Sequence, residues 1–151
     1  MRHYRNRMLV WGALCCALVA AIHIACALLG GDWYRVLGAG EQLAQMSEQG
    51  HWYPAVLTLL IALVFIIWSL YALSGAQMIP RLPFLRTVLC IVAAIFLLRG
   101  LAFFVIVPLF PDNNLTFWIV SSSISVLIGA CYAIGTARVW SSLGYQGKFC
   151  D

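Results

Sequence analysis

The sequence predicts an all-α integral membrane protein, a four-helix bundle with both termini in the cytoplasm and a short amphipathic segment in the first outer connection. Three observations predict this class: the scarcity of charge, four long apolar stretches and the positions of the basic residues. Of the 151 residues, 64% are hydrophobic and 9% are charged, whereas a soluble domain has about 25% charged residues. So few charges cannot cover a water-soluble domain of this length, which excludes a soluble enzyme, a nucleic-acid-binding protein and a disordered regulator.

Four stretches are long and apolar enough to cross a bilayer, which takes about 20 mostly apolar residues in a helix. The prolines fall at the edges of these stretches or in the connections between them, where they do not interrupt a helix. The chain is therefore expected to form a single transmembrane domain over residues 1–151. The predicted spans cover approximately residues 8–30, 54–75, 87–107 and 115–140.

The arginine and lysine residues predict the orientation, because cytoplasmic segments of membrane proteins are enriched in them. The first connection has one base, Arg35, beside three acids, and the third has Asp112 and no base. The two terminal segments and the second connection hold most of the bases, so we expect both ends inside, in the plasma membrane of a bacterium. These cytoplasmic bases are Arg2, Arg5, Arg7, Arg81, Arg86, Arg138 and Lys148.

The first span has an alternative interpretation. It follows a basic segment and ends near Ala25-Cys26-Ala27, so it is similar to a signal peptide with a small-residue cleavage site. Its apolar run is longer than that of a typical signal peptide, which favours a retained span. Cleavage would leave three spans in the same orientation.

The first connection, residues 31–53, is the longest and predicts a short amphipathic helix on the outer surface. Apolar residues recur at helical spacing from Val36 to Met46 with polar residues between them, although two glycines weaken the first turns. The helix either caps the bundle at the interface or acts as a lid that brings Glu41 or Asp32 over a site between the spans.

Two ionisable residues lie within the spans, His23 in the first and Arg99 in the third. Such residues are costly in a bilayer, so each is a hypothesis for a functional site. At a rise of about 1.5 Å per residue, Arg99 lies about 12 Å and His23 about 10 Å from the outer ends of their spans. Thr58 lies at about 6 Å and residues 121–125 at about 8–14 Å, so all four spans place polar groups in the outer half.

These polar groups predict an outward-facing pocket between the helices. The helical wheel directs His23 into the bundle, whereas Arg99 either points inward or extends to the outer headgroups. No acid lies within a span, so a buried Arg99 needs serine hydroxyls, an acid from an outer connection (Asp32, Glu41, Glu48 or Asp112) or an anionic ligand. A guanidinium binds carboxylate or phosphate in a bidentate manner. The predicted ligand-binding residues are Arg99, His23, Ser121, Ser122, Ser125, Thr58 and Glu41.

Small residues recur at four-residue spacing in the first span, from Ala13 to Ala25, and in the fourth, from Ser121 to Ala137. Such stripes let helices approach closely in lipid. The two stripes either face each other within the bundle or form the seam of a homo-oligomer.

Metal and redox chemistry are not expected. The six cysteines contain no Cys-x-x-Cys pair, and the three histidines are dispersed in depth. Free cysteine also packs as a small apolar residue. The sequence has no phosphate loop, nucleophile elbow or zinc-protease motif. We therefore expect no cofactor, no metal and no catalytic residues.

Three short motifs are spread over most of the chain: His23 followed after six residues by Gly30-Gly31, then Leu82-Pro83, then Leu98-Arg99-Gly100. With these motifs the chain resembles small bacterial four-span inner-membrane proteins of unknown function. The resemblance implies no activity, and it agrees that His23 and Arg99 are the residues of interest.

The sequence favours a protein that binds or transports a small anionic or amphipathic ligand, with Arg99 as the anion partner and His23 as a hydrogen-bond donor or proton acceptor. Transport by so short a chain would require a homo-oligomer. One alternative is a non-catalytic accessory or assembly subunit of a membrane complex, in which Arg99 only locks the bundle. Another is a membrane-embedded enzyme acting on a lipid. The expected partners are the lipid bilayer, the small ligand, and a further copy or a membrane protein partner; nucleic acid is not expected.

Overall fold

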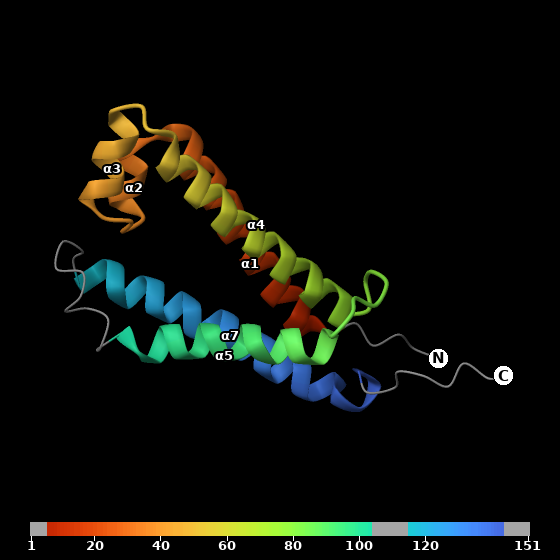
Figure 1. Ribbon diagram of the computed structural model, residues 1–151. Helices are drawn as coiled ribbons and strands as arrows, with labels where there is room; N and C mark the ends of the chain where they lie inside the picture. The colour runs from red at the N-terminus through yellow and green to blue at the C-terminus, as the bar shows by residue number, and fades with distance from the viewer. Residues whose placement is uncertain (1–5, 104–114, 144–151) are drawn as a thin grey trace.

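The structure is a computed structural model of the chain, and it describes residues 6–103 and 115–143. These residues form helices and connecting turns, which confirms the predicted all-α class. Four long helices are joined in an up-and-down order, and two short helices lie between the first two of them (Figure 1). The helices are α1 (Arg7–Leu29), α2 (Gly31–Val36), α3 (Glu41–Glu48), α4 (Trp52–Gly75), α5 (Leu85–Leu101) and α7 (Leu115–Leu143).

Three of the long helices, α1, α4 and α7, are long and apolar enough to cross a membrane. Helix α5 has 17 residues, which is about 25 Å of helix against a hydrocarbon core of about 30 Å. The structure therefore shows three clear candidate spans where the sequence predicted four. The third predicted span, residues 87–107, is helical as far as Leu101, and its last residues, 104–107, lie outside the described part of the chain.

Helix α1 begins where Asn6 caps it. The Asn6 side-chain oxygen accepts a hydrogen bond from the Met8 backbone N–H at 3.2 Å, which satisfies one of the free donors of the first turn. The Asn6 side-chain amide also donates to the Gly135 carbonyl of α7 at 2.6 Å. The start of α1 is thus fixed both by its own cap and by its contact with α7.

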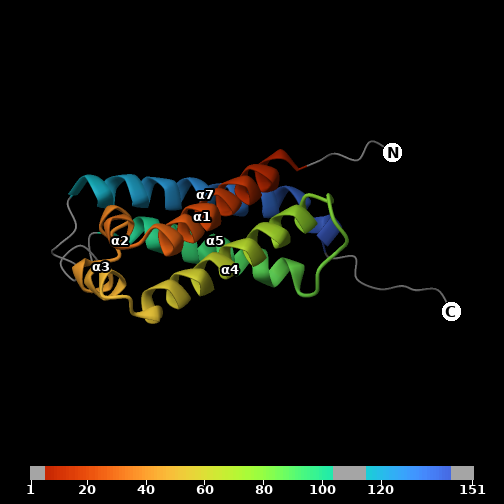
Figure 2. The same cartoon turned by 90° about the horizontal axis from the view of Figure 1, so that it is seen from above.

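The long helices form two antiparallel pairs, α1 with α4 and α5 with α7. The pairs meet at the end where α1 begins and α7 finishes, which we call the base end (Figure 1). They diverge toward the end that carries α2 and α3, which we call the hairpin end. In the orthogonal view the short helices again lie at the far end from the start of α1 (Figure 2).

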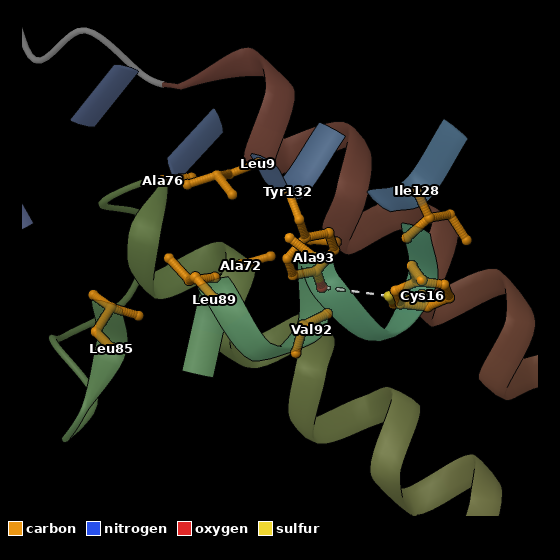
Figure 3. Close-up of a cluster of buried hydrophobic side chains, with 12 residues drawn as sticks. Leu9, Cys16, Ala72, Ala76, Leu85, Leu89, Val92, Ala93, Ile128 and Tyr132 are labelled. Carbon is orange, nitrogen blue, oxygen red and sulfur yellow. Dashed lines mark hydrogen bonds between the residues drawn. The ribbon is translucent and has the colours of Figure 1, made fainter. Parts of the chain in front are cut away.

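Buried side chains of all four long helices form a hydrophobic core toward the base end (Figure 3). Leu9 of α1 fits against Gly135 of α7, where an added Cβ would come within 2.7 Å of the Leu9 side chain. Tyr132 of α7 is fully buried. Its hydroxyl donates to the Trp68 carbonyl of α4 at 2.9 Å and is hydrogen-bonded to the Cys16 thiol of α1 at 3.3 Å. This core holds the two helix pairs together.

The first connection contains two short helices, α2 and α3, rather than the single amphipathic helix that the sequence predicted. Gly38 and Gly40 separate them with φ angles of 68° and 94°, values that favour glycine and interrupt a helix. The predicted apolar stripe is buried only in part, because Val36 is 71% exposed whereas Leu43 is half-buried against a small second core. Tyr34 of α2 and Ala44 of α3 are buried in that core.

The two stripes of small residues do not face each other. Ala17 and Ala21 of α1 are exposed, and α1 instead approaches α7 at Gly12, where an added Cβ would lie 2.9 Å from the Tyr132 ring. On α7, Gly129 of the stripe packs against α5. The middle of the stripe on α1 is therefore outside the contacts of the bundle, whereas Ala13 at its start is buried in the core.

Candidate functional site

Arg99 lies on the buried face of α5. Leu85, Leu89, Val92 and Phe96 are buried at helical spacing, and Arg99 occupies the next position of that series. It stands in the last turn of α5, where a positive charge interacts favourably with the helix dipole. The helix ends about 3 Å beyond Arg99, so in the described part of α5 the arginine is closer to the helix end than the sequence predicted.

The Arg99 side chain is half-buried and contacts α7. Its guanidinium carbon lies 5.1 Å from the centroid of the Trp118 ring, within the range of a cation–π interaction. Its Nη2 donates a weak hydrogen bond to the Ser121 hydroxyl at 3.4 Å. Its Nη1 is buried and has no hydrogen-bond partner among the described residues. Such an unpaired donor is destabilising, since it has left water without a replacement acceptor.

The described acids near the hairpin end are paired with a different arginine. Arg35 of α2 forms a bidentate ion pair with Glu41 of α3, with both N–O distances at 2.8 Å. Its Nη1 also contacts Asp32 at 3.1 Å and Glu48 at 2.5 Å. The Arg35 guanidinium, and to a lesser extent Gln45, lowers the pKa of Glu41 to about 2. The structure therefore places Glu41 in an exposed ion-pair cluster and not beside Arg99, and Asp112 lies outside the described residues.

The serines of α7 have separate roles. Ser121 accepts from Arg99, and the Ser125 hydroxyl donates to the Ser121 carbonyl at 2.9 Å, the usual back-bond of serine within a helix. Ser122 is 5% exposed, and its hydroxyl has no partner in the described part of the chain. It lies in the contact between α5 and α7, where an added Cβ on Gly100 would come within 3.0 Å of the Ser122 carbonyl.

His23 lies on the other helix pair. Its Nδ1 donates to the Val19 carbonyl of its own helix at 2.8 Å, which leaves Nε2 as the acceptor when the ring is neutral. Its ring centroid is 5.4 Å from that of Phe65 in α4, and Phe65 is 6.0 Å from Phe96 in α5. Two aromatic rings thus lead from His23 to α5, whereas the contacts of Arg99 described above are with Trp118 and Ser121 of α7 and not with these rings.

Thr58 belongs to the small core beneath the hairpin. It is 7% exposed, and its hydroxyl donates to the Pro54 carbonyl at 2.8 Å and to the Tyr34 hydroxyl at 3.4 Å. Along α4 it lies about 10 Å beyond Phe65. The polar residues that the sequence predicted at one depth thus lie in three separate places. Arg99 contacts Ser121, His23 contacts Phe65, and Thr58 contacts Tyr34.

A groove of about 410 Å³ lies next to Ser121, between the end of α2 and the start of α7. Gly38 allows this approach, because an added Cβ there would lie 2.3 Å from the Phe117 ring. Apart from Ser121, the sequence did not predict these groove residues, since they come from segments far apart in the chain. The groove is mostly apolar with two hydroxyls, and it is lined by Val36, Leu37, Thr116, Phe117, Val120, Ser121 and Ile124.

No protein-family model, curated protein or solved structure matches the chain. The function must therefore be argued from the chemistry of these residues.

Proposed function

We propose that the chain is a multi-pass membrane protein of the bacterial inner membrane that binds an amphipathic ligand with an anionic head group at the hairpin end. Three helices that are long and apolar enough to cross a bilayer support the membrane location. Apart from Arg35 and Arg99, the described arginines lie near the base end, which supports a cytoplasmic base end and therefore an outward-facing hairpin end.

One observation carries the proposal: a guanidinium within the helix bundle has a buried nitrogen that the described residues do not satisfy. Arg99 has a serine hydroxyl and a tryptophan ring as neighbours and no carboxylate partner among them. The described acids of the hairpin end, those of α2 and α3, are already bound to Arg35. A carboxylate or phosphate would supply both the missing acceptor and the missing counter-charge.

The groove beside Ser121 supports an amphipathic rather than a purely polar ligand. Ser121 contacts Arg99 and also lines the groove, so the anionic group and the apolar part of one molecule would lie next to each other. A largely apolar groove with few polar groups is typical of small-molecule sites. His23 would serve as a second polar group, although its contact with Phe65 sets it apart from Arg99. Transport would in addition require a homo-oligomer.

The proposal is tested by identifying what the protein retains on purification in a neutral detergent. Extracted material from wild type and from Arg99→Gln is compared by mass spectrometry, with Arg138→Gln, an exposed arginine of the base end, as the matched control. We expect an anionic amphiphile in wild type and in Arg138→Gln that is depleted at least about tenfold in Arg99→Gln, equivalent to roughly 1.4 kcal/mol. Equal retention by all three proteins would refute the proposal.

A non-catalytic accessory subunit is the second candidate, and one observation favours it. Arg86 at the base end of α5 lies over the Trp140 ring of α7 with its guanidinium carbon 4.7 Å from the centroid. Arg99 makes the same arrangement with Trp118 at the other end of α5. In this interpretation both arginines only fix the register of α5 on α7, and the charge of each serves packing alone.

The two candidates predict different effects of Arg99→Gln on stability. In the ligand interpretation, the thermal stability of ligand-free protein changes little, because the buried unpaired donor is removed together with its weak bond. In the accessory interpretation, Arg99→Gln lowers the unfolding temperature as much as Arg86→Gln does. Circular dichroism of both variants in the same detergent separates these outcomes.

A further inference from the structure

The described charges are distributed unevenly between the two ends of the molecule. Four arginines lie at or near the base end: Arg7, Arg81, Arg86 and Arg138. The described acids, Asp32, Glu41 and Glu48, belong to the short helices of the hairpin end. Within the described residues, the base end therefore presents only positive charge to whatever surrounds it.

A groove of about 470 Å³ lies between α5 and α7 toward the base end. Small side chains form its walls, and Cys90 and Ala137 are exposed, so the groove opens on the outside of the helix pair. Its lining residues are Cys90, Ala93, Ala133, Thr136, Ala137 and Trp140. A groove with mostly small apolar walls that opens on the outside of the helix pair is chemically suited to an acyl chain.

A buried hydroxyl in this groove and a buried guanidinium nitrogen next to its Trp140 have no partner among the described residues. Thr136 is 4% exposed and lines the groove, yet its hydroxyl makes no hydrogen bond with the residues that the structure describes. By contrast, Thr58 and Ser125 in the same protein donate to the carbonyl four residues earlier. The Nε of Arg86 is also buried without a described partner, while its Nη2 donates to the Trp140 carbonyl. Thr136 thus lines the groove with an unpaired hydroxyl, and Arg86 reaches the groove through its contact with Trp140.

We propose that this groove is a binding site for an anionic phospholipid of the leaflet at the base end. The lipid phosphate accepts hydrogen bonds from Arg86 and Thr136, and one acyl chain lies along the small residues of α5 and α7. Trp140 lines the groove at the level where tryptophan is enriched in membrane proteins, the headgroup region. The surrounding arginines raise the local concentration of anionic lipid. The inference rests on the membrane location proposed above, and it does not depend on a ligand at Arg99.

The test measures lipid binding to the full chain in a neutral detergent by native mass spectrometry, with phosphatidylglycerol and phosphatidylcholine as probes. Wild type is expected to retain one phosphatidylglycerol with about tenfold preference over phosphatidylcholine, or roughly 1.4 kcal/mol. Thr136→Val, which keeps the shape of the side chain, and Arg86→Gln should each remove most of that preference. Ala137→Leu, which fills the groove at an exposed position, should weaken binding of both lipids.

Two control variants keep the result specific. Arg138→Gln removes an exposed arginine of the same end without touching the groove and should bind phosphatidylglycerol as wild type does. Arg99→Gln removes any lipid held at the hairpin end, so Thr136→Val is also measured in the Arg99→Gln background. The proposal would be overturned if Thr136→Val and Arg86→Gln kept the wild-type preference for phosphatidylglycerol. It would also be overturned if Arg138→Gln lost as much of that preference as they do, because the lipid would then be attracted by surface charge alone. If Arg86→Gln does not fold, Thr136→Val and Ala137→Leu decide the question. A loss of phosphatidylglycerol preference on Thr136→Val that persists in the Arg99→Gln background belongs to this groove and not to the site at Arg99, so the two proposals can fail separately.

Discussion

The contact between α5 and α7 can be tested at Gly100, because both proposed binding sites depend on these two helices. An added Cβ at Gly100 would lie 2.5 Å from Cγ2 of Val126, and 3.0 Å from both the Val126 nitrogen and the Ser122 carbonyl oxygen. Two of these atoms belong to the backbone, and the third is a branched methyl close to it. No side-chain rotation relieves the overlap, so Gly100→Ala must push α5 away from α7.

The change in the free energy of unfolding on Gly100→Ala is the balance of two opposing effects. Overpacking of a close contact costs about 1–3 kcal/mol, and replacing glycine by alanine within a helix returns up to about 1 kcal/mol through lower backbone entropy. Gly100→Ala should therefore lower the free energy of unfolding by about 1 kcal/mol, and Gly100→Val should lower it by more. Separation of the helices also weakens the neighbouring contact between Gly129 and Leu97, where an added Cβ on Gly129 would lie 2.8 Å from Leu97 Cγ.

The assay is reversible unfolding in mixed detergent micelles, followed by circular dichroism. Gly31→Ala is the control, because its Cβ would meet only the flexible Glu48 side chain, at 2.6 Å from Oε1. That carboxylate can move at little cost, so Gly31→Ala should change stability by less than Gly100→Ala does. A Gly100→Ala protein as stable as wild type would refute the close packing of α5 on α7.

Three further predictions concern the hairpin and the core. Arg35→Gln should raise the pKa of Glu41 from about 2 toward its ordinary value, which NMR titration of the carboxyl group measures. Because that pKa is lowered in the folded state, the ion pair stabilises the hairpin above about pH 4.5 and loses this effect as the pH falls toward 2. Protection factors for hydrogen exchange in the hairpin that stay constant over this range would contradict it. Gly38→Ala should detach the hairpin from α7 and speed amide hydrogen exchange in α2. The φ angle of Gly38 is 68°, which disfavours alanine, and an added Cβ would overlap the Phe117 ring. Tyr132→Phe should lower the free energy of unfolding by about 0.5–1.5 kcal/mol, because it removes both hydrogen bonds of a buried hydroxyl, and an unchanged stability would show that these bonds contribute nothing.

Hydropathy located the long helices well because it depends on local composition. The predicted first and fourth spans agree with α1 and α7 within a few residues. The length of α5 was not predictable in this way, because apolar residues continue past Leu101, where the described helix ends. The break between α2 and α3 was also missed. Gly38 and Gly40 are weak helix formers, which the sequence shows, but their positive φ angles end the helix there, which the sequence does not show.

The candidate site was predicted in part. Sequence position predicted that Arg99 and Ser121 lie at a similar depth in the membrane. In the structure, Arg99 Nη2 lies 3.4 Å from the Ser121 hydroxyl. The partners of Glu41 and Thr58 could not be predicted, since Arg35 and Tyr34 reach them only after the chain folds back at Gly38 and Gly40. Depth along separate helices also says nothing about which helices pair. His23 and Arg99 were expected near one another, and they lie on different pairs.

The central claim is that Arg99 binds an anionic group, and the dissociation constant for dodecyl phosphate tests it most directly. Binding is measured by isothermal titration calorimetry in a neutral detergent for wild type, Arg99→Lys and Arg99→Gln. We predict that Arg99→Gln weakens binding about tenfold or more, and that Arg99→Lys, which keeps the charge but loses the bidentate geometry, falls between the two. Equal dissociation constants for all three proteins would contradict the claim.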